Sequence, residues 1–180
     1  MNINETLKHY FGYDSLRPGQ QELIEGILQR KDVLGIMPTG AGKSLCYQVP
    51  ALMLDGITIV VSPLISLMTD QVKALNQAGV HAAYINSSLT ENQIRTALFY
   101  AAQGRYKIIY VAPERLNTIR FLEFACQVDI SMVTVDEAHC ISQWGQDFRP
   151  SYVGIADFLA QLPKRPVVSA FTATATERVK

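Results

Sequence analysis

The sequence is poor in cysteine and histidine, and this scarcity limits the kinds of site it can hold. It contains three cysteines, Cys46, Cys126 and Cys140, and three histidines, with no C-x-x-C pair. Structural zinc needs four Cys or His ligands at close spacing, so no zinc site is expected in this segment. The cysteines are interpreted as free thiols in a reducing compartment, which predicts a cytoplasmic protein.

The sequence also lacks a charge excess and long apolar runs. Sixteen Lys and Arg balance 16 Asp and Glu, giving a net charge of zero. A stand-alone nucleic-acid-binding domain is usually basic, so any contact with nucleic acid should be local or shared with residues outside this chain. No apolar run approaches the roughly 20 residues of a membrane helix, and the N-terminus lacks the features of a secretory signal. No membrane contact is expected.

What the sequence does contain is an alternation of short apolar runs and longer helical patterns. Hydrophobic residues make up 48% of its 180 residues. Strands are predicted at residues 32–37, 57–62, 81–86, 107–112, 132–136 and 167–171. Helices are predicted at residues 18–29, 43–54, 65–78, 91–103 and 153–161. Near-continuous apolar strands separated by helices indicate an α/β fold, with a mainly parallel sheet covered on both faces.

A glycine-rich turn follows the first predicted strand and precedes a predicted helix. Its sequence is Pro38-Thr39-Gly40-Ala41-Gly42-Lys43-Ser44. This is the strand–loop–helix setting of a P-loop, in which glycines let backbone N–H groups converge on phosphate oxygens. Lys43 is expected to neutralise the β- and γ-phosphates, and Ser44 to ligate Mg²⁺. Met37 occupies the place of the motif's first glycine, so a Gly-rich turn with a chance Lys-Ser is the alternative.

Two adjacent carboxylates, Asp136 and Glu137, follow a later apolar strand. Ligands of open α/β sheets bind at this end of the strands. Asp136 is expected to hold Mg²⁺, directly or through water, and Glu137 to orient and deprotonate an attacking water. Alternatively, the two acids cap the next element. His139 is expected to couple this site to its surroundings rather than to act as an acid or base.

The residues after the two carboxylates carry a specific resemblance. The run Asp136-Glu137-Ala138-His139-Cys140-Ile141-Ser142-Gln143-Trp144-Gly145-Gln146-Asp147-Phe148-Arg149-Pro150 resembles motif II and the aromatic-rich loop of the RecQ family of superfamily-2 DNA helicases. Other segments resemble that family's motifs in the same order, at residues 11–20, 37–50, 62–71, 112–116 and 171–175. Met commonly replaces the first glycine in this family. Leu16, Ala41 and Phe171 depart mildly from its pattern. The resemblance implies a RecA-like P-loop NTPase domain that uses ATP and Mg²⁺.

The resemblance also implies how the nucleotide base is held. By carry-over, Tyr13 and Arg17 contact the adenine and Gln20 hydrogen-bonds its edge. A ring and a guanidinium can stack on a base, and an amide can both donate and accept hydrogen bonds. From the residues alone, Tyr13 is equally well interpreted as core packing and Gln20 as an amide on a helix surface.

Single-stranded and duplex DNA are the partners that the resemblance implies. Trp144 and Phe148 are expected to stack on unpaired bases, and Gln143 and Arg149 to tie their loop to the nucleotide site. The alternative for Trp144, the single tryptophan, is a buried anchor. Other expected contacts carry their own alternatives. Phosphate contacts are expected from Ser62, Ser66 and Arg115, although Ser62-Pro63 would equally start a helix. Thr172 and Thr174 are expected to hydrogen-bond the region of the carboxylates, although a strand end of ordinary Thr content is the alternative.

Residues 1–180 are expected to be the first RecA-like domain of an ATP-dependent 3′–5′ DNA helicase of repair and recombination. A second RecA-like domain, a zinc-binding region and a winged helix are expected to be absent. In this family the second domain supplies an arginine finger, which is worth about 10³–10⁵ in rate. The chain alone is therefore expected to bind nucleotide weakly, to hydrolyse it negligibly and not to unwind DNA. An RNA helicase of the DEAH type and a nucleotide-dependent switch without motor action are the alternatives.

Overall fold

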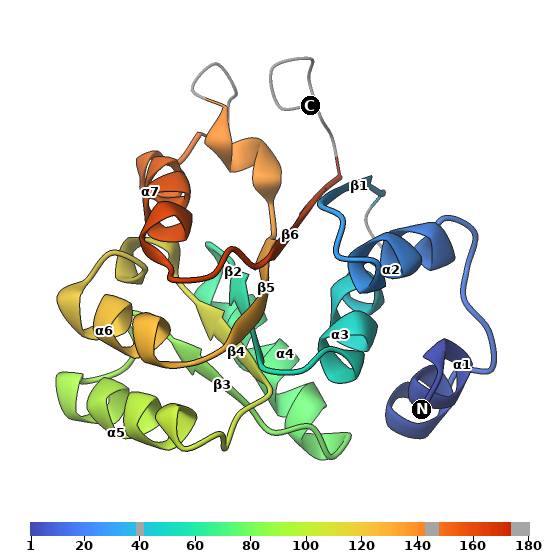
Figure 1. The fold of residues 1–180 in the computed structure, drawn as a ribbon, viewed down its shortest axis with the longest axis horizontal. Coiled ribbons are helices and arrows are strands. Elements are labelled where there is room, and N and C mark those ends of the chain that lie inside the picture. The colour runs from blue at the N-terminus through green and yellow to red at the C-terminus, as the bar shows by residue number, and fades with distance from the viewer. Residues whose placement is uncertain (39–41, 143–147, 174–180) are drawn as a thin grey trace.

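The computed structural model describes residues 1–38, 42–142 and 148–173, in which a parallel sheet lies between two layers of helices (Figure 1). Six strands are found in these residues, in the order β1-β6-β5-β2-β4-β3, and every neighbouring pair is parallel. The strands are β1 (Val33–Ile36), β2 (Ile57–Val61), β3 (Ala82–Ile85), β4 (Ile108–Val111), β5 (Ile130–Val135) and β6 (Val167–Thr172). The predicted α/β class and parallel sheet are confirmed.

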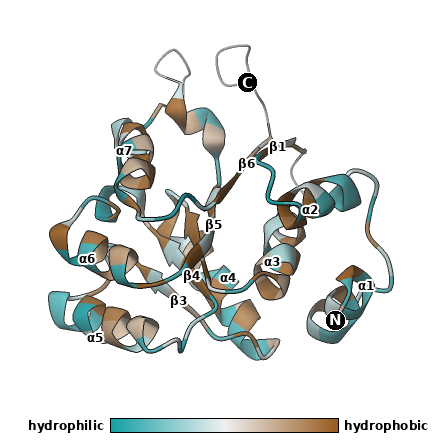
Figure 2. Ribbon diagram, viewed as in Figure 1, coloured by the Kyte–Doolittle hydropathy of each residue, from teal (hydrophilic) through white to brown (hydrophobic). Residues whose placement is uncertain are grey.

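The helices divide between the two faces of this sheet. They are α1 (Ile3–Thr6), α2 (Gln20–Leu28), α3 (Lys43–Met53), α4 (Ile65–Gln77), α5 (Glu91–Ala102), α6 (Ile119–Gln127) and α7 (Gly154–Gln161). Side chains of α2, α3 and α4 share one apolar cluster, while those of α5, α6 and α7 share another. Figure 2 shows the hydrophobic strands in the middle and hydrophilic stretches on the outer helices. Both faces of the sheet are therefore covered, as continuous apolar strands require.

The central strands explain the continuous apolar runs of the sequence. All residues of β2, β4 and β5 are buried. Alternate residues of β2 pack into opposite clusters, because Ile59 belongs to the α5–α7 side and Val60 to the α2–α4 side. Each fully buried Ile or Val contributes about 1.5–3 kcal/mol. The sheet is thus a rigid base for the residues at its ends.

Two helical regions were not expected from the sequence. Helix α6 is only nine residues long and packs Phe121 and Phe124 against the core. At the N-terminus, α1 runs into the π-helical turn Leu7–Phe11. Asn2 and Glu5 form a capping box there, and this N-x-x-E spacing was a signal available in the sequence. In the part of the chain that the structure describes, no helix has the length and apolar character needed to cross a membrane.

Candidate nucleotide-binding site

The glycine-rich turn and the acidic pair meet at the carboxyl edge of the sheet. Lys43 is the first residue of α3, and Asp136 directly follows β5. Gly42 precedes α3 with φ +78°, and a Cβ on it would lie 2.3 Å from Gln20 Nε2. Its left-handed backbone conformation favours glycine at this position, and a Cβ there would require the Gln20 side chain to shift. Thr39, Gly40 and Ala41 lie outside the described residues.

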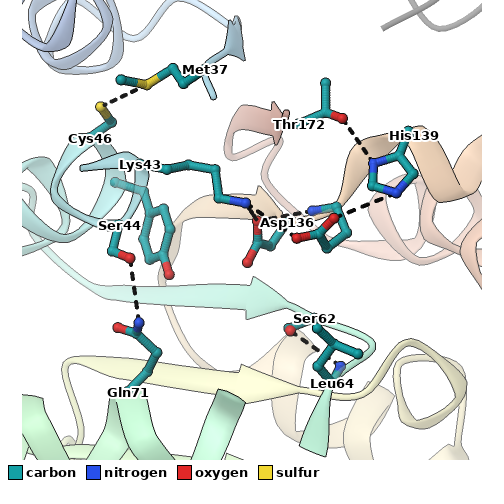
Figure 3. A network of polar contacts seen from close by, with 12 residues as sticks. Met37, Lys43, Ser44, Cys46, Ser62, Leu64, Gln71, Asp136, His139 and Thr172 are labelled. Atoms are coloured by element: carbon teal, nitrogen blue, oxygen red, sulfur yellow. Dashed lines mark hydrogen bonds and ion pairs between the residues drawn. The ribbon is translucent and has the colours of Figure 1, made fainter. Parts of the chain in front are cut away.

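Lys43 joins both predicted catalytic carboxylates. Its Nζ lies 2.9 Å from Asp136 Oδ1 and 3.3 Å from Glu137 Oε1 (Figure 3). The Asp136 side chain is 5% exposed, so its charge needs this partner. Burial acts to lower the pKa of Lys43, but the two carboxylates outweigh it and the pKa is raised. The ammonium is therefore charged at neutral pH.

The backbone at the acidic pair is held in an unusual conformation. Glu137 has φ +54° and ψ +46°, the left-handed region that side chains with a Cβ rarely occupy. Its N–H donates to Asp136 Oδ1 at 2.9 Å, and the Asp136 carbonyl accepts from the Tyr152 hydroxyl at 2.7 Å. Asp136 N–H donates to Val61 O on β2. Strain of this kind persists where surrounding contacts fix the backbone, often at functional sites.

His139 links the acidic pair to the end of β6. Its Nδ1 lies 2.9 Å from Thr172 Oγ1, and its Nε2 lies 3.5 Å from Glu137 Oε2. Thr172 is fully buried at the last position of β6. The structure therefore brings His139, which was expected to couple the site to its surroundings, into contact with Glu137 and with Thr172, which was expected to hydrogen-bond this region. Thr174 lies outside the described residues.

Oxygen ligands suited to Mg²⁺ are present at this edge. The Ser44 hydroxyl and the Asp136 carboxylate are hard donors of the kind Mg²⁺ prefers, so they fit the ion as protein ligands. In the structure, Ser44 Oγ accepts a hydrogen bond from Gln71 Nε2 on α4, at 3.4 Å. Among the described residues, no group of three His, Cys, Asp or Glu side chains is placed to hold a metal.

Among the predicted base-binding residues, Gln20 contacts Gly42 of the glycine-rich turn, and two of the alternative interpretations are wrong. Gln20 is 1% exposed, so its interpretation as a surface amide is wrong. Its Nε2 donates to Gly42 O at 2.9 Å, and its Oε1 accepts from Arg17 N–H at 2.7 Å. These two hydrogen bonds use one N–H and one oxygen lone pair of the Gln20 amide. Tyr13 is 53% exposed, so its interpretation as core packing is also wrong.

The predicted DNA contacts are more scattered. Ser62 is fully buried, and its hydroxyl accepts from Leu64 N–H at 3.5 Å, which favours the alternative of a turn before a helix. Ser66 is exposed in the first turn of α4. Arg115 pairs with Glu91 at 3.3 Å. Phe148 is half-buried and Arg149 exposed, while Gln143 and Trp144 lie outside the described residues.

Several residues of the site were not predicted from the sequence. Tyr152 belongs to the short turn Pro150–Val153 and clamps the backbone of Asp136, although nothing in its local pattern marks it. Gln48 and Gln71 form a hydrogen-bonded pair behind Ser44. Gln48 falls on the buried face of α3, where an amide surrounded by apolar residues was the available signal.

Met37 accounts for the missing first glycine of the motif. Its side chain is 7% exposed and packs in the core below the turn. The Cys46 thiol lies 3.6 Å from its sulfur. Burial raises the pKa of Cys46 to about 11, so this thiol is protonated and part of the core. Met37 therefore anchors the turn by apolar contact.

Comparisons with known proteins identify the family of this chain. A family model described as DEAD/DEAH box helicase matches residues 17–180. The ATP-dependent DNA helicase RecQ of Bacillus subtilis is 53% identical over 174 residues, which cover 96% of this chain and 29% of that protein. RecQ of Haemophilus influenzae is 47% identical and is covered over 27% of its length. The predicted resemblance to RecQ helicases is confirmed, and the chain spans less than a third of these two relatives.

Solved structures share the fold at low sequence identity. A hypothetical ATP-dependent RNA helicase from Sulfolobus tokodaii aligns with a TM-score of 0.75 at 22% identity, covering 99% of this chain and 53% of that one. The DUF1998 helicase MrfA bound to DNA and AMPPNP aligns with a TM-score of 0.71 at 17% identity, covering 97% and 26%. At these identities the likeness establishes the fold alone.

Proposed function

Because the chain belongs to the DEAD/DEAH box helicase family, we propose that it is the first RecA-like motor domain of an ATP-dependent DNA helicase of the RecQ type. The longer protein would couple ATP hydrolysis to 3′–5′ movement along single-stranded DNA and to duplex unwinding, in repair and recombination. The observation that carries the proposal is the meeting of Lys43 with Asp136 and Glu137 at the carboxyl edge of the sheet.

The geometry supports a division of labour among these residues. Lys43 exchanges its carboxylate partners for the β- and γ-phosphates, which releases Asp136 and Glu137. Ser44 and Asp136 would hold Mg²⁺, which would supply charge neutralisation at the phosphates. Glu137, whose backbone is fixed by Asp136 and Tyr152, orients the attacking water and accepts its proton. Gln20 sets the position of Gly42 and would contact the adenine, beside Tyr13 and Arg17.

Nucleotide state would reach DNA through two routes. His139 contacts both Glu137 and Thr172, so a shift of the Glu137 side chain would alter the hydrogen bond to Thr172 on β6. The loop that contains Gln143, Trp144, Phe148 and Arg149 follows the same turn and would present aromatic rings to unpaired bases. Ser66 and Arg115 would contact phosphates of the single strand.

The proposal is tested by the ATPase activity of the full-length protein that carries this chain. Activity is measured with single-stranded DNA, with RNA and without nucleic acid. We expect stimulation by DNA, lost on Lys43→Ala and retained in Lys73→Ala, a matched change at an exposed lysine of α4. Residues 1–180 alone are expected to hydrolyse ATP negligibly, because the resemblance to RecQ helicases implies that a second RecA-like domain supplies the arginine finger. Stimulation by RNA alone, or by neither polymer, would contradict the proposal.

A further inference from the structure

The backbone around Glu137 takes part in a closed ring of four hydrogen bonds. Cys140 N–H donates to Glu137 O at 2.9 Å, and Arg149 N–H donates to Cys140 O at 3.0 Å. Tyr152 N–H donates to Arg149 O at 3.0 Å. The Tyr152 hydroxyl then reaches back to the acidic pair and donates to Asp136 O at 2.7 Å. This hydrogen-bond ring fixes the two carboxylate residues relative to the backbone at Arg149.

Tyr152 supplies the one bond of the hydrogen-bond ring that depends on a side chain. The other three bonds join backbone groups, so a change of side chain does not remove them. Tyr152 is 1% exposed and packs in the apolar cluster that α5, α6 and α7 share. Burial raises the pKa of its hydroxyl, which therefore stays protonated and able to donate. Removing this single oxygen would open the hydrogen-bond ring and leave its backbone bonds in place.

The bond from Tyr152 holds one end of the peptide group that joins Asp136 to Glu137. At the other end of this peptide group, Glu137 N–H donates to Asp136 Oδ1 at 2.9 Å. Glu137 lies in the left-handed region, with φ +54° and ψ +46°, and such a backbone persists only where surrounding contacts fix it. The direction in which the Glu137 side chain leaves the backbone therefore depends on both hydrogen bonds.

The hydrogen-bond ring also includes backbone beside the proposed DNA contacts. The sequence between Cys140 and Arg149 contains Phe148, one of the residues proposed to stack on unpaired bases. Arg149 is exposed, and its backbone forms two bonds of the hydrogen-bond ring. Tyr152 lies in the short turn that directly follows Arg149. One continuous set of hydrogen bonds thus joins the backbone next to Phe148 to the proposed catalytic base, Glu137.

We propose that Tyr152 is a positioning residue through which single-stranded DNA, bound at Phe148 and Arg149, acts on Glu137. This inference rests on the proposed function. DNA bound there restricts the backbone at Arg149, and the hydrogen-bond ring carries that restriction to the peptide group before Glu137. The carboxylate is then held in a fixed direction for the attacking water, and a water held in one geometry reacts faster. Tyr152 itself contacts neither DNA nor nucleotide.

The inference is tested by the ATPase activity of the full-length protein that carries this chain, with and without a single-stranded oligothymidylate. Tyr152→Phe removes the hydroxyl and keeps the phenyl group. We expect the DNA-stimulated kcat to fall about 10-fold, the factor in rate that one buried hydrogen bond can supply. The basal kcat, the KM for ATP and the affinity for oligothymidylate should stay within about twofold of wild type, because Tyr152 contacts neither ligand.

Two further variants control for the loss of a buried oxygen. Ser169→Ala also removes one buried, hydrogen-bonded oxygen, but in β6 and outside the hydrogen-bond ring, so DNA stimulation should be unchanged. A 4-aminophenylalanine introduced at position 152 supplies an N–H donor in place of the hydroxyl and should restore stimulation. Thermal unfolding gives an assay temperature at which every variant is folded. Tyr152→Met, whose side chain adapts to irregular space, replaces Tyr152→Phe if the latter does not fold.

The possible results separate this inference from the proposed function. If DNA does not stimulate the wild-type ATPase, the proposed function is wrong and the inference falls with it. If DNA stimulates Tyr152→Phe as strongly as wild type, or if its basal and stimulated rates fall by the same factor, the inference is wrong and the proposed function stands. An equal loss of stimulation in Ser169→Ala, or no recovery with the amino group at position 152, would also overturn the inference.

Discussion

The two ends of the parallel sheet use charged residues in different ways. At the carboxyl end, Lys43 faces Asp136 and Glu137 in a half-buried cluster beside a strained backbone. At the amino end, Asp32 pairs with Arg165 at 2.6 Å, and Lys107 Nζ donates to the carbonyls of Leu54 and Gly56. The first set crowds like charges around one cation. In the second set, each charged side chain pairs with one opposite charge or donates to backbone carbonyls at the end of a helix.

The difference shows which charges serve folding. Two adjacent carboxylates around one ammonium leave an excess of negative charge that a further cation would offset. By contrast, Lys107 caps carbonyls after α3, and Asp32 ties the start of β1 to β6 through Arg165 and Val168 N–H. Removing residues at the amino end should cost stability. Removing the strained residue at the carboxyl end should not.

The largest expected effect is at Lys107. We expect Lys107→Met to lower the free energy of unfolding by about 1–3 kcal/mol, because it leaves two carbonyls without their donor. Lys164→Met, at an exposed lysine 3.5 Å from Asp129, should cost less than about 1 kcal/mol. Urea unfolding measures both. Equal costs would remove the contrast between a capping lysine and a surface ion pair.

The second effect concerns the strained backbone at Glu137. We expect Glu137→Gly to be more stable than Glu137→Ala by about 1 kcal/mol, because only glycine occupies the left-handed region without a Cβ penalty. Both changes remove the same carboxylate, so the difference between their free energies of unfolding reports the cost of the left-handed backbone conformation alone. Thermal and urea unfolding measure it. A more stable alanine variant would mean that the conformation carries no strain.

The smallest effect concerns pH at Asp32. Its hydrogen bonds with Arg165, more than its burial, set the pKa of Asp32 below the usual 3.8. A lowered pKa means that the carboxylate stabilises the fold above the unfolded value, near pH 4, and that this is lost as pH falls through the folded value. Asp32→Asn should cost at most about 1 kcal/mol at pH 7, because the side chain is 47% exposed. Urea unfolding between pH 7 and pH 3 should show the difference shrinking. If the difference in free energy of unfolding between wild type and Asp32→Asn did not change with pH, the lowered pKa of Asp32 would be contradicted.

The sequence predicted local structure better than it predicted contacts. Continuous apolar runs located all six described strands, and the strand–loop–helix pattern located Lys43 and Ser44 at the start of α3. The burial of Gln20 could not be predicted, because it depends on the left-handed Gly42 lying against it. Tyr152 and Gln71 reach the site from elements distant in sequence, and no local pattern encodes such contacts.

The position of β6 has a consequence for how the protein is made. In the described sheet, β1 pairs with β6 and with no other strand, and β6 in turn separates β1 from β5. During synthesis the strand that leads into the glycine-rich turn emerges early, while its partner emerges close to residue 172. Closing so long a loop is slow, and pairing of this kind dominates folding times. The end of the sheet that carries the glycine-rich turn is therefore expected to be assembled last, once β6 pairs with β1.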